Sequence, residues 1–220
     1  MSTLPKLLVF AAGTKTGGGS GFREMVRNVT TGVLQAHLVG VVSPHATGGV
    51  RAIADTYAIP FIHFTGPWSS EAYQCLLATS EATWVASSGW LKPVRGLDPR
   101  RTFNIHPGPL PRFGGKGMYG QHVHRAVLDA FQQGDVTASA VTMHFVTDFD
   151  TDGDYDRGPS FFRYPVLIEA NDTLETLSAR VNSIEHGWQS FVTNLVIHEQ
   201  ITWDGKDPAS LVVPEWYPFL

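Results

Sequence analysis

Leu7-Leu8-Val9-Phe10-Ala11-Ala12 is a continuous apolar run that leads directly into a glycine-rich segment, residues 13–21. An unbroken apolar run of this length is typical of a strand that is buried on both faces of a sheet. Residues 22–29 then follow with the apolar spacing of a helix. A buried strand, a glycine-rich turn and a helix in this order predict the start of an α/β domain.

The alternation of strands and helices continues along the chain. In a long helix over residues 174–195, which we expect Asp172 to cap, apolar residues recur at every third or fourth position and share one face. The pattern predicts an α/β, Rossmann-like fold: a mostly parallel sheet of about seven strands with one antiparallel strand late in the chain, flanked by helices. Further strands are predicted over residues 38–42, 61–64, 84–86, 102–105, 138–146 and 161–166, and further helices over residues 50–57, 71–78 and 121–131.

The charge balance argues against a partner that is bound by electrostatics. Sixteen Lys and Arg residues stand against 20 Asp and Glu residues, for a net charge of −4, whereas nucleic-acid and membrane binders need a basic surface. No apolar run approaches the roughly 20 residues that span a bilayer, and the first 12 residues lack the pattern of a secretion signal. We therefore predict a soluble, cytoplasmic protein with no nucleic-acid and no membrane partner.

The sequence predicts no metal site. Cys75 is the one cysteine, which excludes a disulfide framework and a cysteine-rich metal centre, and we expect it on the apolar face of a helix. His122 and His124 have no third ligand at suitable spacing, and helical geometry points them to different faces, so we expect surface histidines. The acidic residues 148–156 begin like a calcium-binding loop, but Pro159 stands where that loop requires a bidentate Glu.

Asn104 and His106 are the first candidates for chemistry. They lie two residues apart at the end of a predicted strand, so their side chains point the same way. Pro107 then takes the chain out of the sheet, at the edge where α/β folds bind ligands. An amide donor and an imidazole at this edge can stabilise an oxyanion and handle a proton. A strand-capping His106 without a role in chemistry is the alternative, and spacing alone leaves both open.

These residues belong to a longer pattern that resembles the glycinamide ribonucleotide formyltransferases, folate-dependent enzymes of purine synthesis. The resemblance spans roughly residues 7 to 190, and its central block, Asn-x-His-Pro followed by Leu-Pro, is shared across folate-dependent formyltransferases. It implies the Rossmann-like formyltransferase fold. The matching segments are Asn104-Ile105-His106-Pro107, Leu110-Pro111, Gly114-Gly115-Lys116-Gly117-Met118-Tyr119-Gly120, His122-Val123-His124, His144-Phe145-Val146, Tyr155-Asp156-x-Gly158-Pro159, Ala179-Arg180-Val181 and Glu185-His186.

The resemblance implies three catalytic residues, Asn104, His106 and Asp156. Asn104 and a protonated His106 would stabilise the oxyanion that forms when an amine attacks a formyl carbon. Asp156 would raise the pKa of the imidazole and carry the proton of the amine. Asp152, in a similar Asp-Gly pair, is the competing candidate, and the acidic residues around Asp156 are expected to raise one another's pKa values.

The glycine-rich loop is the candidate phosphate site. Backbone N–H groups at a helix N-terminus bind anions, and glycines let a phosphate approach closely. A dinucleotide site is disfavoured because Ser43, and not an acidic residue, ends the second strand; an ordinary flexible connection is the remaining alternative. In the resembled family this loop holds the 5′-phosphate of the ribonucleotide. The expected binding residues are Gly17, Gly18, Gly19, Ser20 and Gly21.

Folate and ribose contacts are likewise implied by the resemblance. Glu185 matches the family's ribose-binding glutamate, although an exposed helix glutamate is the plainer explanation for any single Glu. Asn182 stands where many relatives have a Lys beside the phosphate, so Lys15 or Lys116 must compensate or the acceptor is another molecule. The predicted folate-binding residues are Trp90, Leu91, Lys92, Val94, Val146 and Thr147, with Trp90 and Leu91 as ordinary core residues being the alternative.

The predicted function is transfer of the formyl group of 10-formyltetrahydrofolate, a co-substrate, to the amine of glycinamide ribonucleotide in purine synthesis. The partners are then small molecules, acting on a monomer or homodimer. One domain, residues 1–220, is expected to comprise a phosphate-binding half (1–100), a catalytic and folate-binding half (101–200) and an extended C-terminal tail (201–220). The alternatives are formylation of another amine, such as an amino sugar nucleotide, and an inactive folate- or nucleotide-binding module.

Overall fold

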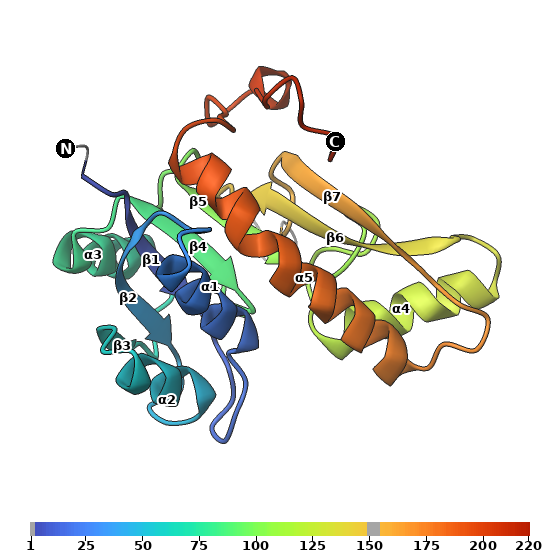
Figure 1. Cartoon of the computed structure of the whole chain (residues 1–220), viewed down its shortest axis with the longest axis horizontal. Coiled ribbons are helices and arrows are strands. Elements are labelled where there is room, and N and C mark those ends of the chain that lie inside the picture. The colour runs from blue at the N-terminus through green and yellow to red at the C-terminus, as the bar shows by residue number, and fades with distance from the viewer. Residues whose placement is uncertain (1–2, 149–154) are drawn as a thin grey trace.

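A single twisted sheet forms the centre of the computed structural model, which describes residues 3–148 and 155–220. Within these residues the sheet has seven strands, which confirms the predicted number, and their order is β3-β2-β1-β4-β5-β6-β7 (Figure 1). The strands are β1 (Lys6–Phe10), β2 (His37–Ser43), β3 (Phe61–His63), β4 (Trp84–Ser88), β5 (Thr102–His106), β6 (Ala138–Phe145) and β7 (Ser160–Leu167). The helices are α1 (Ser20–Thr30), α2 (Gly49–Thr56), α3 (Ser70–Ser80), α4 (Gln121–Gln132) and α5 (Leu174–Ile197), with a 3₁₀ turn η1 at Pro208–Ser210.

The sheet changes character along its width. Strands β1 to β5 pair in parallel, whereas β6 runs antiparallel to both β5 and β7. The order reverses between β1 and β4, because the chain builds β2 and β3 on one side of β1 and then returns to the other side. Such a reversal leaves a crevice at the carboxyl ends of the two strands, where α/β sheets bind ligands.

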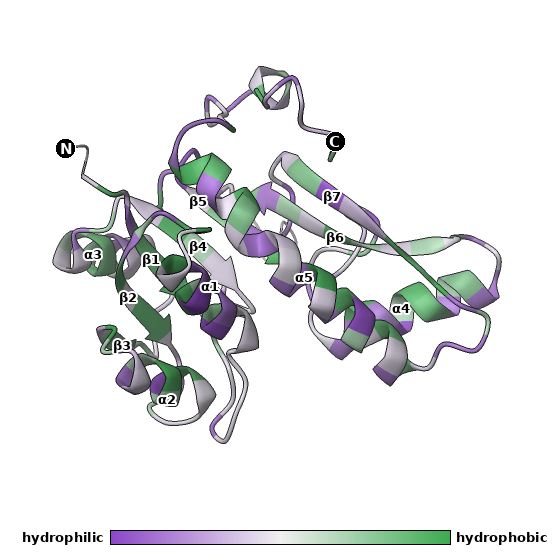
Figure 2. Cartoon of the chain, in the orientation of Figure 1, coloured by the Kyte–Doolittle hydropathy of each residue, from purple (hydrophilic) through white to green (hydrophobic). Residues whose placement is uncertain are grey.

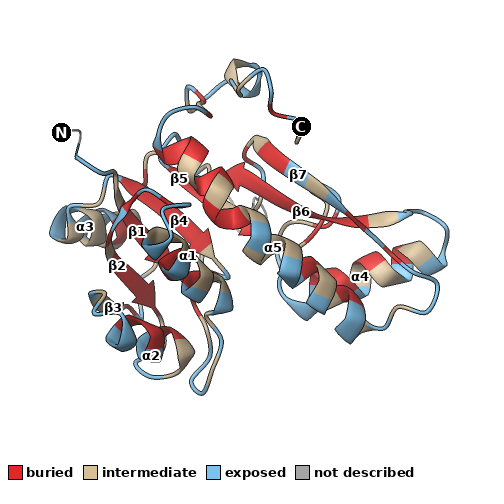
Figure 3. Ribbon diagram, viewed as in Figure 1, coloured by how far each residue is buried: buried red, intermediate tan, exposed pale blue. Residues whose placement is uncertain are grey.

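The apolar run in β1 alternates between two cores. Leu7 and Val9 face a core formed with α1, α2, α4 and α5, while Leu8 and Phe10 face a second core closed by α3. All four side chains are fully buried, and Figure 3 shows the central strands in the colour of buried residues. Figure 2 shows the same strands as mainly apolar. The unbroken run therefore arises because neither face of this strand meets water.

The helices begin and end close to their predicted bounds, with two corrections. Helix α1 begins at Ser20, two residues earlier than predicted, so the last part of the glycine-rich segment is already helical. Asp172 does not cap α5: Thr173 does, in a reciprocal pair of hydrogen bonds with Thr176. Asp172 instead accepts hydrogen bonds from Arg180, which holds the pKa of this carboxyl well below its usual range.

Residues 201–220 lie over the end of the sheet that contains β6 and β7. Trp203 and Tyr217 are buried, and the backbone N–H of Arg163 on β7 donates to the carbonyl of Phe219 at 2.8 Å. Figure 1 shows this segment returning across the top of α5 to β7.

The exposed surface of α3 differs from the prediction. The prediction of a buried Cys75 is wrong, since its side chain is exposed on α3. Helix α3 turns Tyr73 inward instead. None of the helices in residues 3–148 and 155–220 is long and apolar enough to cross a membrane.

Candidate active site

A cleft of about 760 Å³ opens at the carboxyl ends of the central strands. Its walls come from the loop after β1, the loop after β4, the end of β5 and one side of α5. The glycine-rich segment 115–120 and the first turn of α4 close it from the other half of the molecule. The cleft therefore draws together segments from both halves of the chain, and it lies at the strand-order reversal.

The glycine-rich loop folds so that the first turn of α1 faces the cleft. Gly19 precedes α1 with φ +83°, and no side chain caps the helix, so its first N–H groups stay available. Gly18, Gly19, Ser20 and Gly21 line the cleft. Gly17 does not: its N–H donates to Oγ1 of Thr14, and its carbonyl accepts from other loop backbone. Four of the five predicted phosphate-binding residues therefore share the cleft, and Gly17 is a structural turn residue.

Two glycines that the sequence analysis did not single out support this loop. A Cβ at Gly48 would lie 1.9 Å from the carbonyl oxygen of Thr14, and one at Gly49 would lie 2.0 Å from that of Gly18. Only glycine permits so close an approach of the start of α2 to the loop. The signal in the sequence is the Gly-Gly pair before a helix, but nothing local indicates what it packs against.

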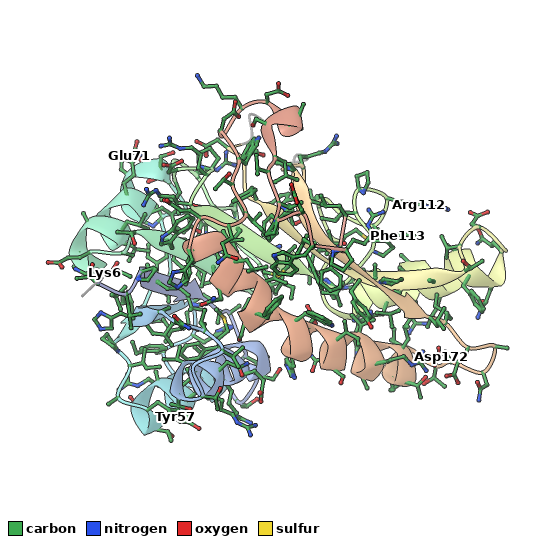
Figure 4. The ribbon with its side chains drawn as sticks, turned by 45° about the horizontal axis from the view of Figure 1, so that its top comes forward. Lys6, Tyr57, Glu71, Arg112, Phe113 and Asp172 are labelled. Carbon is green, nitrogen blue, oxygen red and sulfur yellow. The ribbon has the colours of Figure 1, made fainter. Side chains whose placement is uncertain are left out.

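Asn104 and His106 both line the cleft at the end of β5, as predicted. His106 is buried, and its Nε2–H donates to the carbonyl of Phe113, 2.8 Å away, on the loop that follows β5. Figure 4 labels Phe113 on this loop. Its other nitrogen, Nδ1, lies 3.7 Å from Oδ2 of Asp156. Burial lowers the pKa of His106, and attraction to Asp156 offsets only part of that effect. The expectation of a raised pKa is therefore wrong for the unliganded site, because desolvation outweighs the carboxylate.

Asp156 lies in the connection between β6 and β7, and its carboxylate approaches two histidines. Its carboxylate lies 3.3 Å from Nε2 of His144 and accepts the N–H of Gly115 at 3.1 Å. The backbone of Asp156 is left-handed, with φ +59°, a conformation that Asp tolerates better than most residues. Gly158 holds this turn against β6, since a Cβ there would lie 1.8 Å from the carbonyl oxygen of Phe145. The Asp-x-Gly-Pro sequence thus aims the carboxylate at the histidines.

The pKa of Asp156 is lowered. Burial acts to raise it, but the hydrogen bond with His144 and the positive potential of His106 and His144 outweigh the burial. Most of the acidic residues that were predicted to raise this pKa lie outside the described residues, so their effect stays a prediction. Asp152, the alternative catalytic carboxylate, lies outside the described residues, as does most of the acidic segment, so its role stays a prediction.

His144 is a further member of the site. It lies in one of the segments that carry the family resemblance, but no role was assigned to it from the sequence. Strand β6 pairs antiparallel with β5 so that His144 lies opposite Asn104, and Nε2 of His144 is 3.2 Å from Nδ2 of Asn104. Its Nδ1–H donates to the carbonyl of Phe145 at 2.9 Å. When Nε2 is unprotonated it accepts from Asn104, and when protonated it donates to Asp156. The strand register, which the sequence does not reveal, is what brings His144 here.

The predicted folate residues surround the cleft and a small cavity of about 50 Å³ beside it. Leu91 lines the main cleft, and Val94, Val146 and Thr147 line the small cavity, while Trp90 and Lys92 border both. Leu91 is half exposed and not a core residue. Such a cavity is far below the roughly 300 Å³ of small-molecule sites, so by itself it is too small for a flat heterocycle.

Trp90 is both a core residue and part of the cleft wall, the two alternatives that the sequence left open. It is almost completely buried, packs on Phe10 with ring centroids 5.2 Å apart, and donates from Nε1 to the hydroxyl of Tyr73. It also forms part of the cleft wall. Lys92 lies over the ring of Trp68, with Nζ 5.5 Å from the ring centre, at the exposed rim.

Helix α5 contributes Glu185 to the cleft. Glu185 is half-buried, which excludes the exposed-glutamate alternative, and burial raises its pKa to about 7. Asn182 donates to its carboxylate at 3.4 Å. Of the two lysines that were considered as compensation for Asn182, Lys116 lines the cleft and Lys15 does not.

The prediction of surface histidines on α4 is half wrong. His122 is exposed, whereas His124 is 6% exposed and lines the cleft. His124 belongs to the buried face of α4 together with Val123 and Val127. The sequence did not reveal this, because the packing of α4 against the rest of the molecule determines which face is buried. Across residues 3–148 and 155–220, no group of three or more His, Cys, Asp or Glu side chains is arranged to hold a metal ion.

Comparison with known proteins agrees with this architecture. Residues 6–193 match the protein family described as formyl transferase. The chain belongs to the formyl transferase family. Among curated members, the chloroplastic phosphoribosylglycinamide formyltransferase of Arabidopsis thaliana is 34% identical over 90% of this chain and 67% of its own length. The enzyme of that name from Bacillus subtilis is 28% identical over 84% of this chain and 91% of its own. The chain thus spans about two thirds of the plant formyl transferase.

Solved structures of formyl transferases share the fold. Glycinamide ribonucleotide transformylase 1 of Symbiobacterium toebii superposes with a TM-score of 0.77 at 22% identity, covering 96% of this chain and 95% of that chain. A formyltetrahydrofolate deformylase of Pseudomonas syringae gives a TM-score of 0.73 at 17% identity, over 97% of this chain and 67% of its own. Because proteins named for transfer and for deformylation share the fold, the fold alone does not select the acceptor.

Proposed function

We propose that this formyl transferase moves the formyl group of 10-formyltetrahydrofolate to the amine of glycinamide ribonucleotide. The observation that carries the proposal is the convergence of Asn104, His106 and Asp156 with the first turn of α1 in one cleft. Curated relatives of plants and Bacillus subtilis bear the name of this activity. The cleft offers donors for a developing oxyanion, a carboxylate for a proton, and backbone N–H groups for a phosphate.

The chemistry is an acyl transfer through a tetrahedral intermediate. The amine nitrogen attacks the formyl carbon, the C=O electrons move to oxygen, and collapse of the intermediate breaks the bond between carbon and N10. Donation from the Asn104 amide and from His106 stabilises the transient oxyanion, which is where preorganised donors contribute most. In this proposal the substrate oxygen replaces the Phe113 carbonyl as the partner of Nε2 of His106.

Proton transfer is assigned to Asp156. The attacking amine must lose one proton and N10 must gain one, so no net proton is consumed. A lowered pKa keeps the Asp156 carboxylate ionised at neutral pH, ready to accept the proton directly or through water. The carboxylate lies 3.7 Å from Nδ1 of His106 and 3.3 Å from Nε2 of His144, so both rings are close enough to hold it in position while the oxyanion is present.

The remaining contacts divide the cleft between the two substrates. We assign the phosphate to the N–H groups of residues 18–21 and the ribose hydroxyls to Glu185. The pterin ring is assigned to the side lined by Trp90, Leu91 and the small cavity, whose walls combine apolar side chains such as Val94 and Val146 with polar and charged ones. No metal ion is needed for this chemistry.

A second acceptor class is kept for one specific reason. Asn182 on α5 is exposed and uncharged in the cleft wall, at the position where the resembled family often has a Lys. Transfer to another amine, such as an amino sugar nucleotide, is therefore the alternative. The cytoplasmic location and a monomeric or homodimeric state also stay predictions; the plant relatives are named as chloroplastic.

The test is formyl transfer from 10-formyldideazafolate, followed by the absorbance of the deformylated product, with and without glycinamide ribonucleotide. Turnover that depends on the ribonucleotide supports the proposal. Folate binding without such turnover contradicts the acceptor assignment, and amino sugar nucleotides are then tested in the same assay. Binding of neither substrate contradicts formyl transfer as a whole.

A further inference from the structure

Two histidines in the first turns of α4 have opposite environments. His122 is exposed, and its ring contacts only that of Tyr119, with centroids 5.2 Å apart. His124 is 94% buried, as its 6% exposure implies, yet it forms part of the cleft wall. Two residues of the same type, two positions apart, thus provide a probe of the cleft and its matched control.

The imidazole of His124 has no partner for one of its nitrogens. Within the described part of the chain, Nδ1 of His124 is buried and makes no hydrogen bond. Buried polar atoms are nearly always paired, because an unpaired one retains its desolvation penalty. Burial, together with repulsion from nearby His106, lowers the pKa of His124 to about 4. The ring is therefore neutral at pH 7 and presents a lone pair as well as an N–H.

His124 borders the main cleft but not the small cavity beside it. The small cavity on the predicted folate side is bordered by Asn104 and Asp156, but by no described residue of α4 or α5. His106 and His124 line the main cleft only. Asn104 and Asp156 therefore border both cavities, whereas His106 and His124 border only the main cleft, which α5 also lines.

We infer that His124 is a contact for the amine acceptor, with the unpaired imidazole nitrogen accepting a hydrogen bond from the acceptor's N–H. The inference rests on the proposed function, because it needs the amine acceptor to bind in the main cleft beside His124. Such a contact orients the lone pair of the amine toward the formyl carbon. His124 is too weak a base to retain the proton at neutral pH, so proton transfer stays with Asp156. A hydrogen bond to this unpaired nitrogen also explains why a polar side chain stands at this buried position.

The test compares His124→Leu, His124→Asn and the control His122→Leu in the formyl transfer assay. Loss of one neutral hydrogen bond is expected to raise the KM for glycinamide ribonucleotide about tenfold in His124→Leu. His124→Asn, whose amide oxygen reaches the region of Nδ1, should recover part of this loss. The KM for the folate and all constants of His122→Leu should stay within about twofold of the wild type.

Urea unfolding separates a binding role from a structural one. Since His124→Leu removes an unpaired buried nitrogen, its unfolding midpoint should equal or exceed that of the wild type, although its KM is worse. A lower midpoint together with equal rises in both KM values would overturn the inference in favour of a packing role. An unchanged acceptor KM would overturn it as well.

Imidazole NMR distinguishes failure of the inference from failure of the proposed function. Glycinamide ribonucleotide is added to ¹⁵N-histidine-labelled protein without folate, and the His124 signal is assigned by its loss in His124→Leu. A shift of this signal, with that of His122 unchanged, supports the contact. Wild-type turnover with no shift overturns the His124 contact alone, whereas no binding and no turnover overturns both proposals.

Discussion

The two halves of the sheet contribute to the cleft in different ways. At the predicted phosphate end of the cleft, the β1–β4 half presents mainly backbone: the first turn of α1 and a glycine-rich loop packed closely against the start of α2. The loop after β4 adds the side chains of Trp90, Leu91 and Lys92. Strands β5 to β7 and helices α4 and α5 present side chains, with the buried His106 and His144 beside the Asp156 carboxylate at the centre. A backbone site is damaged by adding atoms and a side-chain site by removing them, so the two halves should respond oppositely to substitution.

The largest effect is expected where side chains are removed from the β5–β7 half. His106→Ala and Asp156→Asn should each lower kcat about 1,000-fold, because oxyanion stabilisation and proton transfer typically contribute factors of this order. The measurement is the formyl transfer rate at saturating substrates. Asp152→Asn is the control, and a comparable loss in that variant would move the catalytic carboxylate to Asp152.

The next effect concerns stability and its pH dependence. Glu185 has a pKa of about 7 in the folded protein against 4.5 as its ordinary value. The folded state therefore binds more protons than the unfolded state between these values, and stability falls as pH rises through this window. The loss for this one group is at most about 3 kcal/mol, at 1.36 kcal/mol per pKa unit.

Urea unfolding of Glu185→Gln checks the sign. At pH 8 the variant should be more stable than the wild type, because it has no buried charge, and at pH 5 the two should be alike. An equal difference at both pH values would show that Glu185 is ionised throughout. The KM for the acceptor should rise in the variant at both pH values if Glu185 holds the ribose.

The backbone half is tested by adding one methyl group. Gly18 and Gly32 have nearly the same backbone, with φ +77° and +79°, but a Cβ at Gly18 would lie 2.9 Å from Cα of Gly13, and one at Gly32 would meet nothing within 4 Å. Both Gly→Ala variants should lose about 1–2 kcal/mol of stability from left-handed strain. Only Gly18→Ala should also raise the acceptor KM, about tenfold, because the phosphate-binding N–H groups move.

The measurements are urea unfolding and steady-state kinetics on the same preparations. A normal acceptor KM in Gly18→Ala would mean that the loop does not hold the phosphate. The β1–β4 half would then form part of the cleft wall without binding the phosphate through its backbone, which contradicts the proposed difference between the two halves.

The smallest expected effect distinguishes two exposed lysines. Lys116 lines the cleft from the segment before α4, whereas Lys15 lies at the exposed end of the glycine loop and does not line it. Lys116→Met should raise the acceptor KM about two- to fivefold at low salt, the range for an exposed charge pair. Lys15→Met should leave it unchanged; the reverse result would place the compensating charge in the backbone half.

The sequence by itself determined the layered α/β fold and much of the site. The apolar run in β1, the periodic helix α5 and the strand-end pair Asn104 and His106 are local patterns, and local sterics and burial are enough to interpret them. The acyl-transfer interpretation came from the resemblance, because the spacing of Asn104 and His106 alone left a strand-capping His106 open. The number of strands and the late antiparallel strand were also predictable from the alternation of elements and the resemblance, whereas the strand order was not predicted.

Only the tertiary structure decided which residues meet. The register of β5 against β6 sets His144 opposite Asn104, and a shift by one residue would turn it to the other face of the sheet. The docking of α4 buries His124 while it leaves His122 in solvent. Desolvation lowers the pKa of His106 despite Asp156 nearby. Each of these outcomes depends on packing between segments distant in sequence, and a local pattern carries no information about the water that such packing removes.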